Sequence, residues 1–260
     1  MFTNNPFAAM GDLLPPLVMQ VYIVLMIVLV AAGTLFDMIH KGSAKYFFDN
    51  LRRSKNKAQQ VDGGELVSIA IQTAVVDVLA SGEFCNARRR VAHLLTMYGF
   101  LIYVITTAVM VFGYATPAAP TPALLPQLWW IGGLMICLGG YWFWFFIRVD
   151  VAAEGNPPFR VMRADLFILA LLASATLGLI WAFLQTSASS GANVFFGLYV
   201  IATTVLFASV PWSKFAHMFF KPAAAFEKRL SYANGTRANL PEPADKPEQF
   251  GSARTAPRHY

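Results

Sequence analysis

The sequence predicts an all-α integral membrane protein: a bundle of five transmembrane helices, N-terminus outside and C-terminus inside, with one cytoplasmic amphipathic helix. Three observations predict this fold class. The 260 residues are 57% hydrophobic and only 13% charged, about half the charged fraction of a soluble domain. Five apolar runs reach the length of about 20 residues that a crossing requires. The basic residues are confined to alternate connections between these runs.

The composition also excludes several classes of protein. An ordinary cytosolic domain would need more charged surface than this chain offers. The formal net charge of +6 is what the inner loops of a membrane protein supply, so it does not indicate a nucleic-acid partner. Two cysteines are too few for a disulfide scaffold or for a self-contained iron–sulfur cluster, which takes four thiolates.

The apolar runs divide the chain into an outer segment (1–16), a membrane domain (17–219) and a cytoplasmic tail (220–260). The predicted spans are 17–39, 92–112, 128–147, 164–184 and 194–219. The last span is over-long and contains Pro211, so we expect its inner end to be kinked or to leave the hydrocarbon. The tail from residue 232 is rich in Pro, Gly, Ala and charge, and we expect it to be disordered.

The orientation follows from the positions of the 20 Lys and Arg residues. Nine lie in the loop 40–91, three in 148–163 and eight from residue 214 onward. The remaining connections have none: 1–16, 113–127 and 185–193. By the positive-inside rule the basic side is the cytoplasm, so the sequence predicts a multi-pass protein of a bacterial or archaeal inner membrane.

A sixth apolar segment, 65–80, is shorter than a span and contains Asp77. On an α-helical wheel, Leu66, Val67 and Ile71 share one side with Ala70, Ala74 and Val78, whereas Glu65, Ser68 and Gln72 lie opposite. A crossing here would also move Arg88–Arg90 to the other side of the membrane. We therefore interpret the segment as an interfacial or partner-docking helix, with a buried re-entrant element as the alternative.

Ionisable side chains within the spans collect at one depth, near the cytoplasmic face. His93 begins the second span, and Lys214 and His217 end the fifth, so the two imidazoles are matched in depth on antiparallel helices. Neutral imidazole is a common ligand of haem iron, and bundle cores hold such cofactors. The alternative is that each His is an interfacial residue. His40 has the same depth, but Lys41-Gly42-Ser43 after it reads as a helix exit.

Two segments carry a resemblance to a known family. They are residues 82–100, GEFCNARRRVAHLLTMYGF, and residues 211–219, PWSKFAHMF. Together they resemble the cytochrome b membrane subunits of the nitrate reductase gamma superfamily. The most similar branch serves sulfur metabolism and includes the quinone-interacting oxidoreductase C subunit, the sulfite-reduction complex M subunit and the heterodisulfide reductase E subunit. The resemblance covers about residues 17–230 and implies axial haem ligation by His93 and His217.

The chain departs from that family in two respects. Many members bind a second haem through His residues at the positions of Tyr103 and Tyr199 here, so the resemblance implies one b-type haem. The quinone-interacting C subunit also has a fused ferredoxin-like domain with Cys-rich motifs, which this chain lacks. In that respect it is similar to the stand-alone membrane anchor of adenylylsulfate reductase in sulfur-oxidising bacteria.

Other residues near the two histidines have two interpretations each. Burying the Lys214 ammonium group costs free energy. Either a haem propionate or quinone oxygen compensates this cost, or the side chain extends to lipid phosphate. Arg88, Arg89 and Arg90 either hold propionates or serve as a topology signal in contact with lipid. Gly99 either admits a flat ring or is a small-residue helix contact.

The sequence therefore predicts a membrane anchor and electron-transfer subunit. It would exchange electrons between a soluble cytoplasmic flavin and iron–sulfur oxidoreductase and the quinone pool, through one b-type haem. A haem-free structural anchor that recruits the same partner and offers a quinone pocket is the alternative. A small transporter is a third class, against which the charge-poor spans argue.

Overall fold

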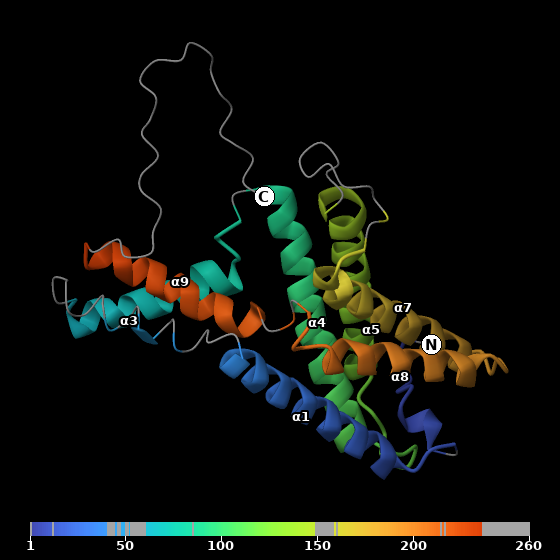
Figure 1. Cartoon of the computed structure of the whole chain (residues 1–260). Helices are drawn as coiled ribbons and strands as arrows, with labels where there is room; N and C mark the ends of the chain where they lie inside the picture. The colour runs from blue at the N-terminus through green and yellow to red at the C-terminus, as the bar shows by residue number, and fades with distance from the viewer. Residues whose placement is uncertain are drawn as a thin grey trace. The chain divides into compact units, whose positions relative to one another are not determined.

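The computed structural model describes residues 2–11, 13–40, 45, 48–49, 52, 61–84, 86–148, 159, 161–213, 215 and 217–235 (Figure 1). Every regular element in these ranges is helical. The main helices are α1 (Pro16–His40), α3 (Gly63–Gln72), α4 (Ala87–Gly113), α5 (Leu124–Trp142), α7 (Leu166–Thr186), α8 (Ala192–Ala208) and α9 (His217–Ala233). Short 3₁₀ or π-helical elements are η1 (Ala8–Met10), η2 (Thr73–Leu79), η3 (Phe143–Arg148) and η4 (Arg163–Asp165).

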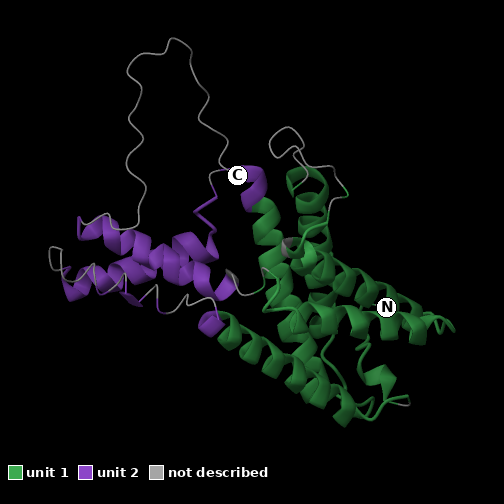
Figure 2. Cartoon of the chain, in the orientation of Figure 1, with its two compact units in different colours: residues 1–37, 91–216 green, residues 38–90, 217–260 purple. Residues whose placement is uncertain are grey.

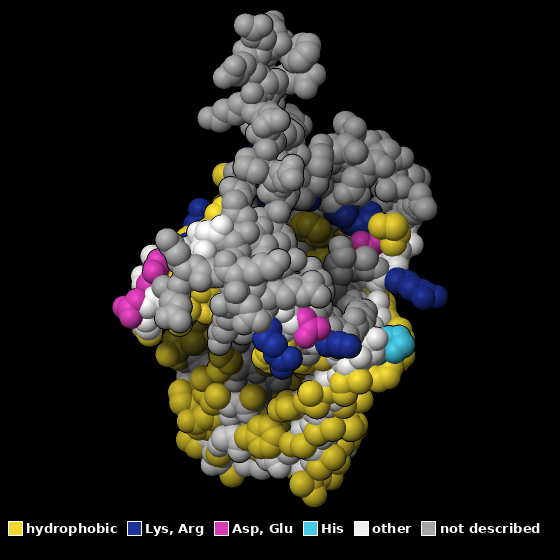
Figure 3. All heavy atoms as spheres, turned by 60° about the vertical axis from the view of Figure 1, so that its left-hand side comes forward, with side chains coloured by type: hydrophobic (Ala, Val, Ile, Leu, Met, Phe, Trp, Pro, Cys, Tyr) yellow, Lys and Arg dark blue, Asp and Glu magenta, His cyan; other side chains and the backbone are white. Residues whose placement is uncertain are grey.

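Four helices in the described part of the chain are long and apolar enough to cross a membrane: α1, α4, α5 continued by η3, and α7. They correspond to the first four predicted spans. Their surfaces support the same conclusion, because α1 alone exposes half or more of Leu17, Val21 and Ile27. Exposed hydrophobic side chains also gather on the face drawn in Figure 3. Such an apolar surface is not tolerated in water and indicates a lipid environment.

The fifth predicted span is divided in the structure. Helix α8 is apolar but has 17 residues and ends at Ala208. Turns follow, in which Trp212 N–H donates to the Ser209 carbonyl at 2.9 Å. The helix stops here because Pro211 lacks an N–H and disfavours helical geometry in the residue before it. The interruption expected near Pro211 is thus confirmed, whereas the fifth span and the orientation of the chain stay predictions.

The chain forms two compact units, drawn in different colours in Figure 2. The first, here named the bundle unit, contains residues 1–37 and 91–216. The second, the helix-pair unit, contains residues 38–90 and 217–260.

Glycines bring the helices of the bundle unit into close contact. A Cβ added at Gly132 of α5 would lie 2.8 Å from the backbone nitrogen of Tyr103 and 2.9 Å from the carbonyl oxygen of Gly99, both in α4. At Gly139 an added Cβ would lie 2.6 Å from the Ala92 carbonyl oxygen. Gly133 and Gly140 of α5 face Leu side chains of α7 in the same way. Small residues of this kind let the backbones of neighbouring transmembrane helices approach closely.

The helix-pair unit contains α3, η2 and α9, with α9 packed along both α3 and η2. The segment 65–80 is helical, with bounds of Gly63 and Leu79, whereas its cytoplasmic location stays a prediction. Asp62 caps its start by accepting a hydrogen bond from Gly64 N–H, as an N-cap residue does. Helix α9 extends from His217 to Ala233, where the sequence predicted only the end of a span and a tail. The rest of the predicted disordered tail, from residue 236, lies outside the described residues.

Candidate functional site

His93 lies in the second turn of α4, and its side chain is half-buried. The helix starts here because Asn86 caps it: Asn86 Oδ1 accepts from Arg88 N–H at 2.9 Å and from Arg89 N–H at 3.4 Å. This cap satisfies backbone donors that the first turn would otherwise leave unpaired. The cap thereby fixes the position of His93 in the second turn of the helix.

Arg90 has a partner within the chain. Its Nε–H donates to the carbonyl oxygen of Ala80 at 2.7 Å, which joins the end of η2 to the first turn of α4. Of the basic run, Arg88 is exposed, whereas Arg89 and Arg90 are half-buried. Neither of the two roles predicted for Arg90 included this backbone contact.

Phe215 brings the second motif to the helix that carries His93. It is 2% exposed, and its ring lies edge-on to Phe100 of α4, with centroids 6.3 Å apart. Phe167 and Phe207 complete the cluster, with ring centroids 5.4 and 5.9 Å from that of Phe215. Phe100 lies seven residues after His93 and therefore on the same face of α4. Lys214 and the side chain of His217 lie outside the described residues.

The side chains on the face of α4 that carries His93 are of the kinds that hold a haem. A b-type haem takes two axial ligands, commonly neutral imidazoles, in an apolar pocket of a helix bundle. His93 supplies one such donor, and the Phe215 cluster supplies apolar wall in the same part of the bundle unit. Among the described residues no three His, Cys, Asp or Glu side chains gather as a metal-ion site would require, but haem iron does not need such a group.

Gly99 is in contact with a neighbouring helix. A Cβ added there would lie 2.8 Å from the Gly132 carbonyl oxygen, 2.8 Å from Met135 Cβ and 2.9 Å from Ile136 N. These atoms belong to α5 and cannot move aside without shifting that helix. Of the two interpretations from the sequence, the small-residue helix contact is the one the packing supports.

Tyr103 and Tyr199 meet at Gly178 of α7, where an added Cβ would clash with the Tyr103 hydroxyl and lie 3.1 Å from the Tyr199 ring. Tyr103 stacks on Trp129 with centroids 4.7 Å apart, and Tyr199 stacks on Trp181 at 5.6 Å. Both tyrosines are buried. Two tyrosines from α4 and α8 thus come together here, and aromatic rings fill the space between helices.

The N-terminal segment seals this aromatic cluster. Phe7 is 5% exposed and lies edge-on to Trp129 and Trp181 at 5.9 and 5.3 Å. Asn5 holds the segment in place, because its Nδ2 donates to the Tyr114 carbonyl at 2.9 Å and its Oδ1 accepts from Phe7 N–H at 3.0 Å. The role of this segment was not predictable from the sequence, since its few apolar residues have no helical or strand periodicity.

Two buried carboxylates had no role assigned from the sequence. Asp165, at the start of α7, pairs with Arg148 at the end of η3 through two hydrogen bonds, one of them 2.7 Å long between Nε and Oδ1. Arg148 also lies over the Trp144 ring at 4.4 Å. Asp37 of α1 is 4% exposed. The available signal was an acidic residue within an apolar run, which marks a position of structural or functional importance in a membrane protein.

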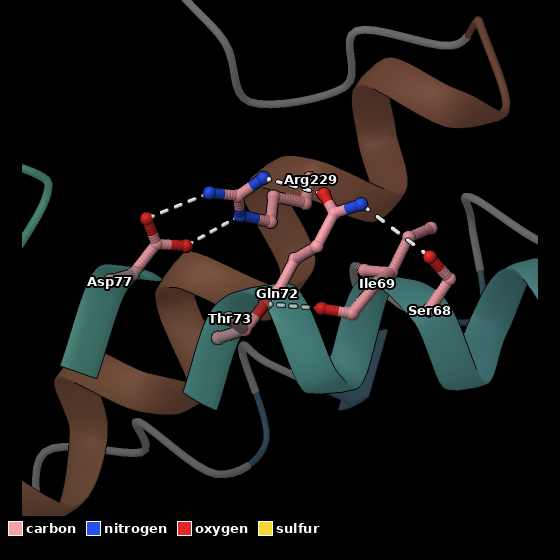
Figure 4. A network of polar contacts seen from close by, with 6 residues as sticks. All are labelled: Ser68, Ile69, Gln72, Thr73, Asp77 and Arg229. Atoms are coloured by element: carbon pink, nitrogen blue, oxygen red, sulfur yellow. Dashed lines mark hydrogen bonds and ion pairs between the residues drawn. The ribbon is translucent and has the colours of Figure 1, made fainter. Parts of the chain in front are cut away.

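A polar network fixes α9 to α3 and η2 (Figure 4). Arg229 donates to both carboxylate oxygens of Asp77, with Nε–Oδ2 and Nη2–Oδ1 distances of 2.5 and 2.9 Å, and to Gln72 Oε1 at 3.1 Å. The hydrogen bonds to Asp77 raise the pKa of the Arg229 guanidinium above its usual value. Asp77, which argued against a membrane crossing in the sequence, is thus the residue that secures the second helix of the pair.

Taken together, four apolar helices joined by polar segments define the class: a multi-pass α-helical membrane protein. Comparisons of the chain with protein-family models, with curated proteins and with solved structures found no match. The function is therefore argued from the site residues.

Proposed function

We propose that this protein is a membrane anchor and electron-transfer subunit. It exchanges electrons between a soluble cytoplasmic flavin and iron–sulfur oxidoreductase, of the adenylylsulfate reductase type, and the quinone pool through one b-type haem. The observation that carries the proposal is the contact between Phe215 and Phe100. It supports the proposal because it packs Phe215 of the second motif against the face of α4 that carries His93.

In this proposal His93 and His217 are the residues that would hold the haem iron. The haem supplies reversible one-electron transfer when it is bound. The Phe215 cluster would contribute apolar wall on the face of α4 that carries His93. Lys214 and Arg90 compensate the negative charge of propionates or of a reduced quinone. The Arg90 contact with Ala80 restricts the guanidinium to the first turn of α4, close to the ligand in sequence.

The basic connections give the proposed partner its docking side. Loop 40–91 and the segment from residue 214 contain 17 of the 20 Lys and Arg residues, and such a surface attracts a partner with an acidic patch. The proposal places this side in the cytoplasm of a bacterium or archaeon, with the N-terminus outside. Lipid headgroups share the same basic residues.

The decisive experiment is a reduced-minus-oxidised absorption spectrum of the purified full-length protein. We expect a b-type α band that is lost in His93→Ala and in His217→Ala but retained in His40→Ala, since His40 is an exposed histidine at the end of α1. An α band that persists in both ligand variants would contradict the assignment. His93→Gly with added imidazole separates ligation from folding, because imidazole restores the band only if position 93 holds the iron.

A haem-free anchor is the second candidate, and two observations favour it. The interior near His93 already contains the tightly packed Phe215 cluster, and Gly99 is closed off by α5. This candidate predicts a folded protein that co-purifies with its soluble partner and contains no iron. Iron content measured on the same preparation as the spectrum distinguishes the two candidates.

A further inference from the structure

We infer that the outer face of α3 and η2 binds the lipid surface of the membrane, with a line of aliphatic side chains immersed at the boundary between headgroups and acyl chains. This line, here named the aliphatic stripe, consists of Val67, Ile71 and Val75. The inference does not depend on the proposed electron-transfer function, because it uses only residues of the helix-pair unit.

The three side chains of the aliphatic stripe are 59%, 58% and 50% exposed. They are spaced by four residues, and the exposed Leu79 continues the line. On a regular α-helix such a line would drift around the axis. Here the chain changes to a π-helix from Thr73 to Leu79, with Ala80 N–H donating to the Val75 carbonyl five residues back. The wider turn of the π-helix keeps Val75 and Leu79 on the same line as Val67 and Ile71. A regular α-helix would instead place Ala74 and Val78 on that side.

The opposite face of the same helix is already covered by α9. Ile69 and Thr73 are buried, and Asp77 holds Arg229 of α9. These three residues are again spaced by four. The aliphatic stripe therefore points away from α9 (Figure 4 shows the polar contacts on the covered side).

Lipid is the occupant that the surroundings of the stripe favour. Only residues 80–86 separate η2 from α4, so the chain restrains Val75 to within about 35 Å of Ala87, the first residue of a helix that can cross a membrane. The first turn of α4 contains three arginines, Arg88–Arg90, which attract anionic headgroups. The stripe contains no Trp, Tyr or Arg, the residues that dominate protein interfaces. Three aliphatic side chains are also too small an area for a stable protein contact.

The test uses the full-length protein in vesicles of zwitterionic and anionic phospholipid, with nitroxide labels on single cysteines. Cys85 and Cys137 are first replaced by Ser. Labels at Ile71→Cys and Val75→Cys report the stripe, and a label at Ser68→Cys on the same helix is the matched control. Collision rates with oxygen, which concentrates in lipid, and with a water-soluble nickel chelate are then measured by electron paramagnetic resonance.

We expect the labels at 71 and 75 to collide more with oxygen than with nickel, at a depth of about 5–10 Å below the headgroups, and the label at 68 to do the reverse. Two results would overturn the inference. Nickel access at 71 and 75 equal to that at 68 would mean that the stripe faces water. Low access to both reagents would mean that protein covers it, and dilution with unlabelled chain would show whether that protein is a second copy. Retained helicity and a monodisperse elution profile exclude misfolding as the cause.

Discussion

The close contact at Gly99 leads to a prediction that separates the two interpretations of this residue. In Gly99→Ala the new Cβ would lie 2.8, 2.8 and 2.9 Å from three atoms of α5, two of them backbone atoms. Because backbone atoms cannot rotate away, α4 and α5 must separate, and overpacking of this kind costs about 1–3 kcal/mol. The replacement also gains up to about 1 kcal/mol of helix propensity.

Gly197→Ala is the matched control, since Gly197 lies within α8 and an added Cβ meets nothing within 4 Å. The gain in helix propensity is common to both variants. The difference in their free energies of unfolding should therefore equal the overpacking cost, about 1–3 kcal/mol, with Gly99→Ala the less stable. Tryptophan fluorescence during a titration with sodium dodecyl sulfate in mild detergent measures this difference.

Equal stability of the two variants would refute the contact between α4 and α5. If Gly99→Ala instead kept its stability and shifted or abolished the α band of the reduced protein, Gly99 would face a porphyrin ring. The packing argument would then be wrong at this position.

Three further variants test other contacts. Asn5→Ala removes the hydrogen bonds that hold the N-terminal segment, and should cost about 1–3 kcal/mol and make that segment sensitive to protease; unchanged protease resistance would contradict its role. Asp77→Asn should destabilise the helix pair by about 1 kcal/mol or less. The Arg229 side chain is 30% exposed, so water screens its interaction with Asp77. The loss of stability in Asp77→Asn should be equal at pH 7 and pH 10. Folding raises the pKa of the Arg229 guanidinium. Its contribution to stability is therefore complete at any pH below its usual pKa and is lost only as the pH rises through the raised pKa. Asp165→Asn removes the carboxylate charge that pairs with Arg148, whose side chain is 11% exposed, and should cost about 3 kcal/mol in the same fluorescence titration.

The fold was predictable from the sequence where local patterns decide it. The lengths of the apolar runs predicted four helices that can cross a membrane. Pro211 indicated the interruption that follows Ala208. The helix over Gly63–Leu79 followed from its amphipathic pattern. Helix α9 was not predicted, because its stability comes from contacts with α3 and η2 and its own sequence contains Pro222.

The candidate site was predictable only in part. The sequence located His93 at the start of an apolar helix, and the cap at Asn86 explains that position. It did not predict that Arg90 binds the Ala80 carbonyl or that Phe215 packs on Phe100. These contacts join residues on different elements, and no local periodicity encodes them.

The sequence by itself determined that this chain belongs in a membrane, where the four helices that can cross it lie and which connections are basic, because hydrophobic length and charge act along the chain. Only the tertiary structure decided the role of small and polar residues. It assigned Gly99 to a helix contact, joined Tyr103 and Tyr199 around Gly178, and paired Asp77 with Arg229. The physical reason is that close packing and buried ion pairs depend on which surfaces meet in space, and that choice is made by the fold as a whole.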